Sequence, residues 1–488
     1  MRILNGERLT SHGNARGRQA VLEILEAGLQ AADAYDAVRK LVRVEGDRLI
    51  IGYAPFEPQD SPVRGEEVYD LSGPGRVYLF GAGKGVIRVA LALEDVLGDR
   101  LAGGQIIDKK GAAAADLAAL TRVEVTLGAH PAPDEDCARG CRRMLEWMSG
   151  LRAEDLVFTI GASGFSSLLT LPAPGVSLED VARTTYALQI ERGVPTGDLS
   201  PVRNHLDLMK GGRIAAHIHP ARAIHLLAKD PESYEHWIYE NYWVHTFPDR
   251  STYADAIDVM HKWDAWEDAP QSVRAHLLRA DPAYETVKPE RYLELSHRIF
   301  GLMPGQQGPW PAAKAKAAAL GYRPVNLAMR LDTEARYAGQ TVATVAKTIE
   351  RAGTPFEAPV ALLTAGELLV TVGRETGIGG RNQEYALAAA LQIAGSERIV
   401  VGAVDTDGTD GPGAQYVAGA EQIPTLAGGL VDGATVQEAR ERGVDLREAL
   451  KRHDATPALL ALESGILATQ STGLQDLGVL LVMEKDGK

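Results

Sequence analysis

An unbroken apolar run passes directly into a glycine-rich turn at Val77-Tyr78-Leu79-Phe80-Gly81-Ala82-Gly83-Lys84, and a helical pattern of apolar residues follows as far as Leu97. An apolar run of this length indicates a buried β-strand. A buried strand, a glycine loop and a helix in succession are typical of an α/β fold with a mostly parallel sheet. Ligands of such sheets bind beyond the carboxyl ends of the strands, so the loop that carries Lys84 is a candidate binding loop.

The same alternation continues on both sides of this stretch. Helices are predicted at residues 17–44 and 134–147, and strands at 104–107, 123–127 and 156–160. A second α/β region follows, with predicted helices at 312–320, 333–352 and 382–393, two strands around Gly366-Glu367 within 360–371, and strands at 399–404 and 478–483. The length of the chain agrees with two or three domains.

The composition is that of a globular protein, because 45% of the 488 residues are apolar and 24% are charged. Lys and Arg number 51 against 65 Asp and Glu, and the resulting charge of −14 argues against nucleic-acid binding. The first residues lack the apolar core of a secretory signal, and Gly, Ser and Pro interrupt the longest uncharged run, 156–178. Cys137 and Cys141 are the two cysteines. We expect a cytoplasmic homodimer with reduced thiols and no membrane partner.

Nine of the 28 aromatic residues fall within residues 234–266. This density suggests a lid, an inter-domain surface or a subunit contact. An aromatic-rich patch of ordinary core is the alternative.

The first two loops of interest follow predicted strands. Gly81 and Gly83 allow close backbone approach and Lys84 adds a charge, which suits a phosphate, although a tight turn with a solvated lysine explains the same residues. Residues 161–167 (GASGFSS) could cradle phosphates with hydroxyls and amides. A serine-capped turn is one alternative for this loop, and a nucleophile elbow is a weaker one because its final glycine is missing.

Two further loops lie in the second region. Residues 377–384 (GIGGRNQE) hold Arg381, which could grip a carboxylate or a transferring phosphoryl group, or could be a solvated arginine in a flexible turn. Residues 405–411 (DTDGTDG) place Asp405, Asp407 and Asp410 after a strand. These carboxylates could hold Mg²⁺, or could form a polar Asx-turn.

Three patches carry less weight. His130 stands at a Pro-rich turn, where a structural role is the alternative to ligand binding. Residues 203–213 form an anion-suited cluster or a solvated basic face. His236, Glu240 and His245 match no zinc spacing.

Taken together, these motifs resemble the glycerate 2-kinase family (MOFRL-type, also described as hydroxypyruvate reductase) along nearly the whole chain. The similarity is strongest at residues 81–84, 128–135, 201–215 (PVRNHLDLMKGGRIA), 379–387 (GGRNQEYAL) and 407–411 (DGTDG). The resemblance implies a Rossmann-like domain with a mostly parallel sheet at 1–300, including an aromatic-rich insert near 230–270. It further implies a smaller, MOFRL-like α/β domain at 301–488, with the active site between the two domains. The implied reaction moves the γ-phosphoryl group of ATP to the 2-hydroxyl of D-glycerate with the help of Mg²⁺.

The expected roles of the site residues follow from the motifs and the resemblance together. Lys84 and Arg381 are the expected catalytic residues. Contacts to the nucleotide are expected from Gly81, Gly83, Ser163, Gly164, Ser166, Lys210, Gly211 and Gly380. Contacts to the acid are expected from His130, Asp134, Glu135, Arg203, Arg213, Asn382 and Glu384. The expected ligands of Mg²⁺ are Asp405, Asp407 and Asp410.

Two alternatives stay open, because the chain departs from the family in its serine loop. The family has Ser-Gly-Gly-Gly-Ser where this chain has Gly161-Ala162-Ser163-Gly164-Phe165-Ser166, and the family's acidic segment is replaced by residues 226–231 and the aromatic stretch. The scaffold could act without ATP, as a lyase, hydrolase or isomerase on a larger hydroxy acid. The chain could also be a non-catalytic partner subunit that binds through residues 234–266.

Overall fold

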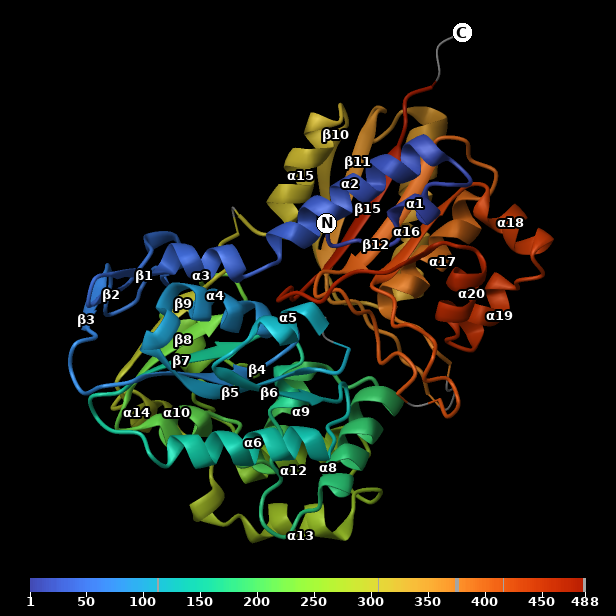
Figure 1. Cartoon of the computed structure of the whole chain (residues 1–488). Coiled ribbons are helices and arrows are strands. Elements are labelled where there is room, and N and C mark those ends of the chain that lie inside the picture. The colour runs from blue at the N-terminus through green and yellow to red at the C-terminus, as the bar shows by residue number, and fades with distance from the viewer. Residues whose placement is uncertain (112–113, 306, 374–376, 416, 486–488) are drawn as a thin grey trace. The chain divides into compact units, whose positions relative to one another are not determined.

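The computed structural model describes the chain except for residues 112–113, 306, 374–376, 416 and 486–488, and it divides into two compact units. The larger unit comprises Asp33–Pro304, and the smaller unit comprises Met1–Ala32 together with Gly305–Lys488 (Figure 1). This division differs from the expected domains in residues 1–32, which join the second half of the chain. Both units are α/β, with a mostly parallel sheet in the larger one, as predicted.

The larger unit is built on a parallel sheet with the strand order β6-β5-β4-β7-β8-β9. Its strands are β4 (Val77–Ala82), β5 (Leu101–Lys109), β6 (Val123–Gly128), β7 (Leu156–Gly161), β8 (Arg222–Leu227) and β9 (His297–Gly301). A separate antiparallel sheet contains β1 (Val42–Glu45), β2 (Arg48–Ile51) and β3 (Glu67–Asp70). The predicted strands at 77–80, 104–107, 123–127 and 156–160 all lie in the parallel sheet.

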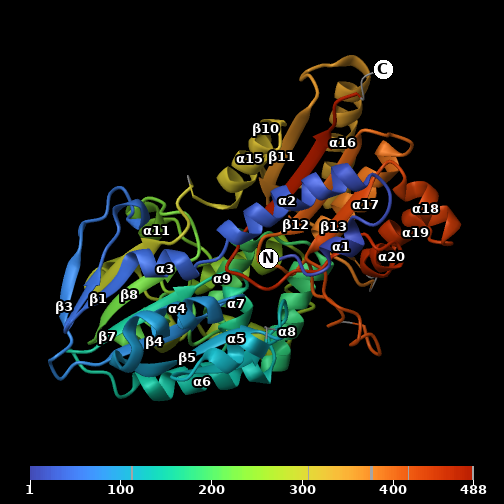
Figure 2. The same ribbon diagram turned by 45° about the horizontal axis from the view of Figure 1, so that its top comes forward.

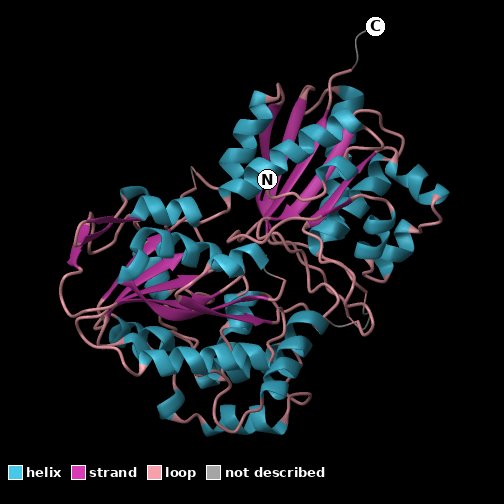
Figure 3. Cartoon of the chain, in the orientation of Figure 1, coloured by secondary structure: helices cyan, strands magenta, loops and turns pink. Residues whose placement is uncertain are grey.

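Both faces of the parallel sheet are covered, which explains its continuous apolar strands. Leu79 packs on one face in a core cluster with α3 (Tyr35–Leu41), α4 (Ile87–Leu97) and β2, and its neighbour Phe80 packs on the other face with α6 (Glu135–Met148) and α10 (Arg213–Ile218). Figure 3 shows helices on both faces. Further helices are α5 (Ala114–Ala119), α7 (Phe165–Leu168), α11 (Tyr234–Tyr239) and α14 (Pro289–Tyr292).

A helical cluster with its own core extends the larger unit. It consists of α8 (Leu178–Thr185), the π-helix η3 (Tyr186–Glu191), α9 (Thr196–His205), α12 (Tyr253–Lys262) and α13 (Gln271–Arg279), which pack around residues such as Leu188 and Leu199. A π-helix is rare and is often found at a functional site.

The aromatic segment 234–266 contributes mainly to the core of the larger unit. The rings of Trp237 and Phe247 stack 5.4 Å apart in the cluster beneath the sheet, and Tyr253 is buried among the helices. Tyr239 and Tyr242 are exposed. The alternative interpretation, an aromatic-rich core patch, therefore describes the buried part of this segment.

Both cysteines lie on the inner face of α6, in contact with the core beneath the sheet. Burial raises the pKa of Cys137 to about 12 and raises the pKa of Cys141 well above its usual value. Because the thiolate is the reactive form, we expect neither thiol of the native protein to react with Ellman's reagent at pH 8, whereas the unfolded chain should release two equivalents. A thiol that reacts within seconds before unfolding would contradict the burial of α6.

The smaller unit contains a mixed sheet with the strand order β10-β11-β15-β12-β13-β14. The pair β10–β11 is parallel and the other pairs are antiparallel. The strands are β10 (Arg323–Leu331), β11 (Val360–Gly366), β12 (Ile399–Asp405), β13 (Gly428–Asp432), β14 (Gly465–Ile466) and β15 (Asp476–Val482). The helices are α1 (Gly6–Leu9), α2 (Ala15–Ala31), α15 (Pro309–Ala319), α16 (Ala335–Ala352), α17 (Arg381–Ile393), α18 (Thr435–Glu441), α19 (Leu446–Lys451) and α20 (Ala455–Ala461). Within the described part of the chain, no helix is both long and apolar enough to cross a bilayer.

Two predicted elements of the sequence differ from the structure. The helix expected at 17–44 is two helices and a strand, because the chain turns after Ala31 and β1 begins at Val42. The second strand expected before Thr371 is a loop, because the chain leaves the sheet after Gly366 and the amide of Leu368 donates instead to Asp476.

Residues 1–32 belong to the smaller unit because α2 packs on its sheet. The close contacts are possible at glycines: a Cβ at Gly17 would lie 2.5 Å from Val400 of β12, and one at Gly28 would lie 2.4 Å from Leu477 of β15. Arg18 adds a buried ion pair, since its Nε lies 2.6 Å from Oδ2 of Asp432. This long-range packing carries no local signal in the sequence.

Candidate active site

The order of the parallel strands reverses between β4 and β7, so the loops that follow these two strands meet at a topological switch point. Ligands of open α/β sheets bind at such a point. The amide of Lys84 donates to the carbonyl oxygen of Ser163 at 2.7 Å and thereby joins the two loops. The two loops that the sequence analysis identified therefore lie together at the carboxyl ends of the two central strands, β4 and β7.

The glycines of the first loop are required by strand packing. A Cβ at Gly81 would lie 2.1 Å from the carbonyl oxygen of Ile160, and one at Gly83 would lie 2.7 Å from the Cβ of Ala162. Both glycines also have positive φ angles, +149° and +143°. These contacts require glycine at both positions whether or not a phosphate binds there.

The carboxylate of Asp108, which the sequence analysis missed, binds backbone amides at the amino end of α4. Asp108, fully buried near the end of β5, accepts hydrogen bonds from the amides of Gly85 at 2.9 Å and Ile87 at 3.1 Å. The amides of Gly85 and Ile87 therefore donate to this carboxylate, where a phosphate-binding helix start would leave them for the ligand. The only sign of this role in the sequence is that Asp108 is an acidic residue near the end of an otherwise apolar strand.

Four of the predicted residues gather at the switch point: Lys84, His130, Ser163 and Gly164. Lys84 is buried, with 4% of its surface exposed. Gly164 has φ of +75°, and a Cβ there would lie 3.3 Å from Cγ of Lys84 and 3.0 Å from Cδ2 of His130. The lysine and the histidine thus flank the serine loop.

Phe165 does not obstruct this loop. The residue is 1% exposed, and its ring packs in the same core cluster as Phe80, where it would lie 2.9 Å from a Cβ at Gly161. The departure from the family's glycine-rich loop is therefore accommodated in the core.

Asp134 and Glu135 have structural partners. Asp134 caps α6 by accepting from the amide of Cys137, and it also accepts from Lys110. Burial favours the neutral acid, but these hydrogen bonds prevail and lower the pKa of Asp134 below its usual value. Glu135 is exposed and pairs with Arg142. The structure therefore does not bring Glu135 to the switch point.

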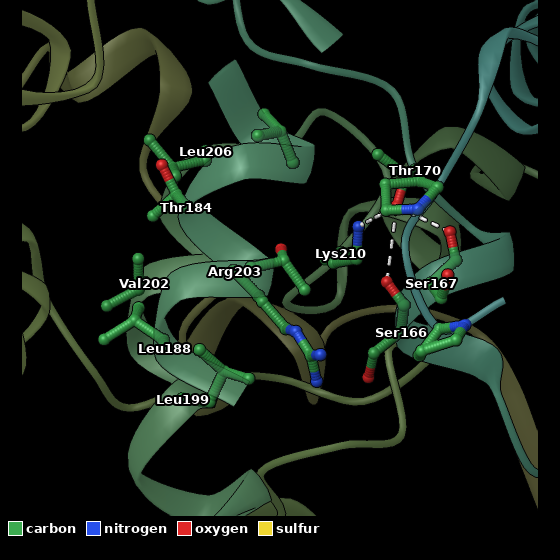
Figure 4. Close-up of a pocket in the computed structure, with 14 residues that line it drawn as sticks. Ser166, Ser167, Thr170, Thr184, Leu188, Leu199, Val202, Arg203, Leu206 and Lys210 are labelled. Carbon is green, nitrogen blue, oxygen red and sulfur yellow. Dashed lines mark hydrogen bonds between the residues drawn. The ribbon is translucent and has the colours of Figure 1, made fainter. Parts of the chain in front are cut away.

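A pocket beside these loops, which we call the serine pocket, collects three further predicted residues: Ser166, Arg203 and Lys210 (Figure 4). Its polar lining also includes Ser167, Thr170, Thr184 and Thr185. The apolar lining consists of Val181, Leu188, Leu199, Val202 and Leu206, with Pro131 and Pro133 from the loop after β6.

Ser166 is held by a histidine that the sequence analysis considered only as a metal ligand. Its Oγ lies 2.7 Å from Nε2 of His245, whose side chain is buried. Burial, together with the positive charges of Lys210 and Arg203, lowers the pKa of His245 well below its usual value. The imidazole is therefore neutral at pH 7.

Lys210 is buried with a carboxylate. Its Nζ donates to Oδ2 of Asp207 at 2.5 Å and to Oγ1 of Thr170 at 2.8 Å. Burial lowers the pKa of Lys210 despite its ion pair with Asp207. Asp207 stands three residues before Lys210, so sequence proximity was the available signal for this partner.

Gly211 and Arg213 have structural roles. Gly211 has φ of +61°, and a Cβ there would lie 2.6 Å from Thr286. The guanidinium of Arg213 donates to the carbonyl oxygens of Asn204, Lys210 and Tyr284. Neither residue lines the serine pocket, so the structure does not support the ligand contacts expected from them.

In the smaller unit, Arg381 begins α17 and is surrounded by carboxylates. Its Nε donates to Asp476 at 2.8 Å, its Nη2 donates to Asp405 at 3.1 Å, and its Nη1 lies 3.5 Å from Glu367. Burial raises the pKa of Asp476, although Arg381 favours its charged form. Asp476 was missed as a partner because it lies 95 residues away along the chain.

Asp410 caps the amino end of α17. Its two carboxylate oxygens accept from the amides of Asn382 at 3.1 Å and Gln383 at 3.0 Å. Burial raises the pKa of Asp410 to about 6. Gly380 is needed beside it, because a Cβ there would lie 2.3 Å from the Asp410 carboxylate. Asp410, Asn382 and Gly380 therefore build the helix start that presents Arg381.

The predicted Mg²⁺ site is not assembled. Asp405 faces Arg381, Asp407 accepts from the amide and hydroxyl of Thr409, and Asp410 caps α17. Across the residues that the structure describes, no group of three or more His, Cys, Asp or Glu side chains is arranged to hold a metal ion. The Asx-turn alternative describes Asp407.

Glu384 belongs to a buried network. Its Oε1 lies 2.7 Å from Nδ1 of His453, and its Oε2 lies 3.3 Å from Nη2 of Arg336. The side chain is 1% exposed and holds this network together, so the structure does not support the expected contact of Glu384 to the hydroxy acid substrate.

Two family models match this chain. The DUF4147 domain, described as a domain of unknown function, matches residues 20–278, and the MOFRL family matches residues 360–475. The chain is 32% identical to a glycerate 2-kinase of Pyrococcus horikoshii, over 96% of this chain and 98% of that protein. It is 33% identical to a D-glycerate 2-kinase of Thermotoga maritima, over 84% of this chain and 91% of that protein.

A solved structure is similar over the same extent. The glycerate kinase of Thermotoga maritima covers 95% of this chain and 99% of its own, at a TM-score of 0.67 and 30% identity. These values confirm the predicted resemblance and the fold class. The chain belongs to the glycerate 2-kinase family and carries both a DUF4147 and a MOFRL domain.

Proposed function

We propose that this protein is an ATP-dependent kinase that phosphorylates the hydroxyl group of a small hydroxy acid, as a glycerate 2-kinase does. The observation that carries the proposal is the similarity to two glycerate 2-kinases, over 96% and 84% of this chain. The buried Lys84 at the switch point of the parallel sheet supports it, because this is where an α/β sheet binds its ligands.

The proposed roles follow from the charge that develops in phosphoryl transfer. Such catalysis depends on positioning and on cations that stabilise the moving group. The ammonium of Lys84 and the guanidinium of Arg381 supply these cations. The carboxylates Asp405 and Asp476 orient Arg381, and the loop of Ser163 and Gly164 lines the nucleotide beside Lys84.

The proposed reaction uses Mg²⁺ together with ATP. Magnesium in nucleotide sites is commonly held by phosphates, waters and one or two carboxylates.

The similarity to kinases does not favour the open alternatives of a lyase, hydrolase or isomerase, or of a non-catalytic subunit. The cytoplasmic location and the homodimer remain predictions. Light scattering on the purified protein tests the second of these.

The test is transfer of label from γ-labelled ATP to D-glycerate and to a panel of small hydroxy acids. We expect a phosphorylated acid and one equivalent of ADP, and no product when EDTA removes divalent cations. ADP formation without a phosphorylated acid, or no turnover with any acid of the panel, would overturn the proposal.

A further inference from the structure

Lys84 lies in a stretch of backbone that its own composition does not hold in one conformation. The residues on either side are Gly83 and Gly85, with φ angles of +143° and +72°. Glycine gives a chain the greatest conformational freedom, so hydrogen bonds have to fix the direction in which the Lys84 side chain leaves this loop. The groups that supply these bonds therefore decide how precisely the ammonium is placed.

Main-chain atoms of neighbouring segments hold the first half of the loop. The amide of Gly83 donates to the carbonyl oxygen of Ile107 at 3.1 Å. The amide of Lys84 itself donates to the carbonyl oxygen of Ser163 at 2.7 Å. Both bonds join main-chain atoms and are therefore kept when a side chain is replaced.

The side chain of Asp108 holds the second half of the loop. The amide of Gly85 donates to Oδ1 of Asp108 at 2.9 Å, and the amide of Ile87 donates to Oδ2 at 3.1 Å. Oδ1 also accepts from the amide of Lys109 at 2.7 Å. Hydrogen bonds to a carboxylate are among the stronger ones in proteins, and the amino end of a helix favours negative charge. Asp108 therefore binds the backbone directly after Lys84 with both carboxylate oxygens.

The strand that carries Asp108 is a rigid support. Strand β5 pairs with β4 on one side and with β6 on the other, and Asp108 is fully buried. Helix α4 packs against β4 and β5 in one core cluster (Figure 2). A group on a strand inside a sheet is held more precisely than a group on a loop. The contacts of Asp108 thus fix the Lys84 loop relative to the sheet.

Resting on the proposed kinase function, we propose that Asp108 is a positioning residue, which holds the Lys84 ammonium where it stabilises the moving phosphoryl group. Asp108 acts through the loop, because both of its carboxylate oxygens are bound to backbone amides. A displacement of about 1 Å in an active site can lower the rate by about a hundredfold. Loss of the carboxylate should therefore lower kcat and leave the KM of the acid unchanged.

Asp155 offers a matched control in the same unit. Its carboxylate is also buried, with 2% of the residue exposed, and accepts from the amides of Arg76 and Arg152, both at 2.8 Å. Asp155 directly precedes β7 and so lies at the amino end of that strand, whereas Lys84 follows the carboxyl end of β4. Replacing Asp155 therefore removes a buried, amide-bound carboxylate at the opposite end of the same sheet.

Steady-state kinetics and thermal unfolding of the full-length protein test the proposal. Asp108→Asn should lower kcat by about tenfold and Asp108→Ala by about a hundredfold, with the KM of the acid unchanged to within about twofold. Asp155→Asn should lower the unfolding temperature as much as Asp108→Asn does, with kcat unchanged. A kcat that stays unchanged in the Asp108 variants, or that falls equally in Asp155→Asn, would overturn the proposal.

A double-mutant cycle separates positioning from a general structural effect. If Asp108 acts through Lys84, its loss has no ammonium left to misplace once Lys84 is replaced by alanine. Asp108→Asn should then lower kcat by less than about twofold in the Lys84→Ala background. Equal factors in the two backgrounds would show that Asp108 acts independently of Lys84 and would refute the positioning role. Asp108→Asn keeps one carbonyl oxygen for the amides, and it carries the test if Asp108→Ala does not fold.

Amide hydrogen exchange, measured by mass spectrometry, tests the loop without turnover. Peptides that contain residues 83–87 should exchange faster in Asp108→Asn than in the unmodified protein, and at the unmodified rate in Asp155→Asn. The two proposals fail in distinguishable ways. If the unmodified protein phosphorylates no acid, the kinase function fails even though the loop exchanges faster as expected. If Asp108→Asn turns over normally, or its loop exchanges no faster, the positioning role fails and the kinase function stands.

Discussion

Replacing Lys84 with alanine is expected to lower kcat/KM for the acid substrate by about a hundredfold or more. Mutations that remove one preorganised group from a transition-state site typically cost this much, because the charge of the moving group loses a fixed partner. We expect the fold to survive, since the contact of Lys84 to the serine loop runs through its backbone amide and is kept in the variant. Steady-state kinetics and thermal unfolding, measured on the same preparation, separate the two effects.

The control for this variant is Lys451→Ala, because the side chain of Lys451 is 78% exposed. Its kinetics should match those of the unmodified protein. A Lys84→Ala enzyme with unchanged kcat/KM would remove Lys84 from the site.

Replacing Arg381 with alanine is expected to abolish turnover and also to destabilise the smaller unit. Arg381 neutralises Asp405 and Asp476, whose side chains are 5% and 4% exposed. Removing one partner of a buried ion pair leaves an uncompensated charge and costs about 3–5 kcal/mol. Chemical denaturation with urea should show this loss, in contrast to Lys84→Ala.

The stability loss of Arg381→Ala should depend on pH. Burial already raises the pKa of Asp476, and without the guanidinium this pKa rises further above that of the unfolded chain. A carboxyl group with a raised pKa keeps its proton in the folded protein at low pH. The free energy of unfolding falls as the pH rises through the folded-state pKa, because the buried group then becomes charged. The deficit relative to the unmodified protein should therefore be larger at pH 8 than at pH 5.

Adding Asp476→Asn to the Arg381→Ala variant tests this cause. The double variant should recover part of the free energy of unfolding at pH 8, because one buried charge is removed. A deficit that is equal at both pH values, or that Asp476→Asn deepens, would show that loss of packing and not charge destabilises the variant.

Much of the larger unit could be predicted because its signals are local. The apolar run before Gly81 marks a strand covered on both faces, and the recurrence of strand, loop and helix fixes the fold class. The grouping of the Lys84 and Ser163 loops follows from the same rule, since both end parallel strands. These inferences need only periodicity and the geometry of a parallel sheet.

The partners of the side chains in the smaller unit could not be predicted from local sequence patterns. Three acids in Asp-Thr-Asp-Gly-Thr-Asp form an attractive metal motif, yet Asp410 caps a helix and Asp405 faces Arg381. Whether a carboxylate holds a cation or a backbone amide depends on partners that lie far along the chain. The same applies to Ser166 and His245, which are separated by 79 residues, and to Arg18 and Asp432, which are separated by 414.

The division of the chain has a consequence for its synthesis on the ribosome. The larger unit is one continuous segment and can fold as soon as it has emerged. Helix α2 emerges before it, but β12 and β15, the strands that α2 covers, are translated after the larger unit. The apolar face of α2 therefore stays exposed until β12 and β15 have been translated. During this interval the face is accessible to a chaperone.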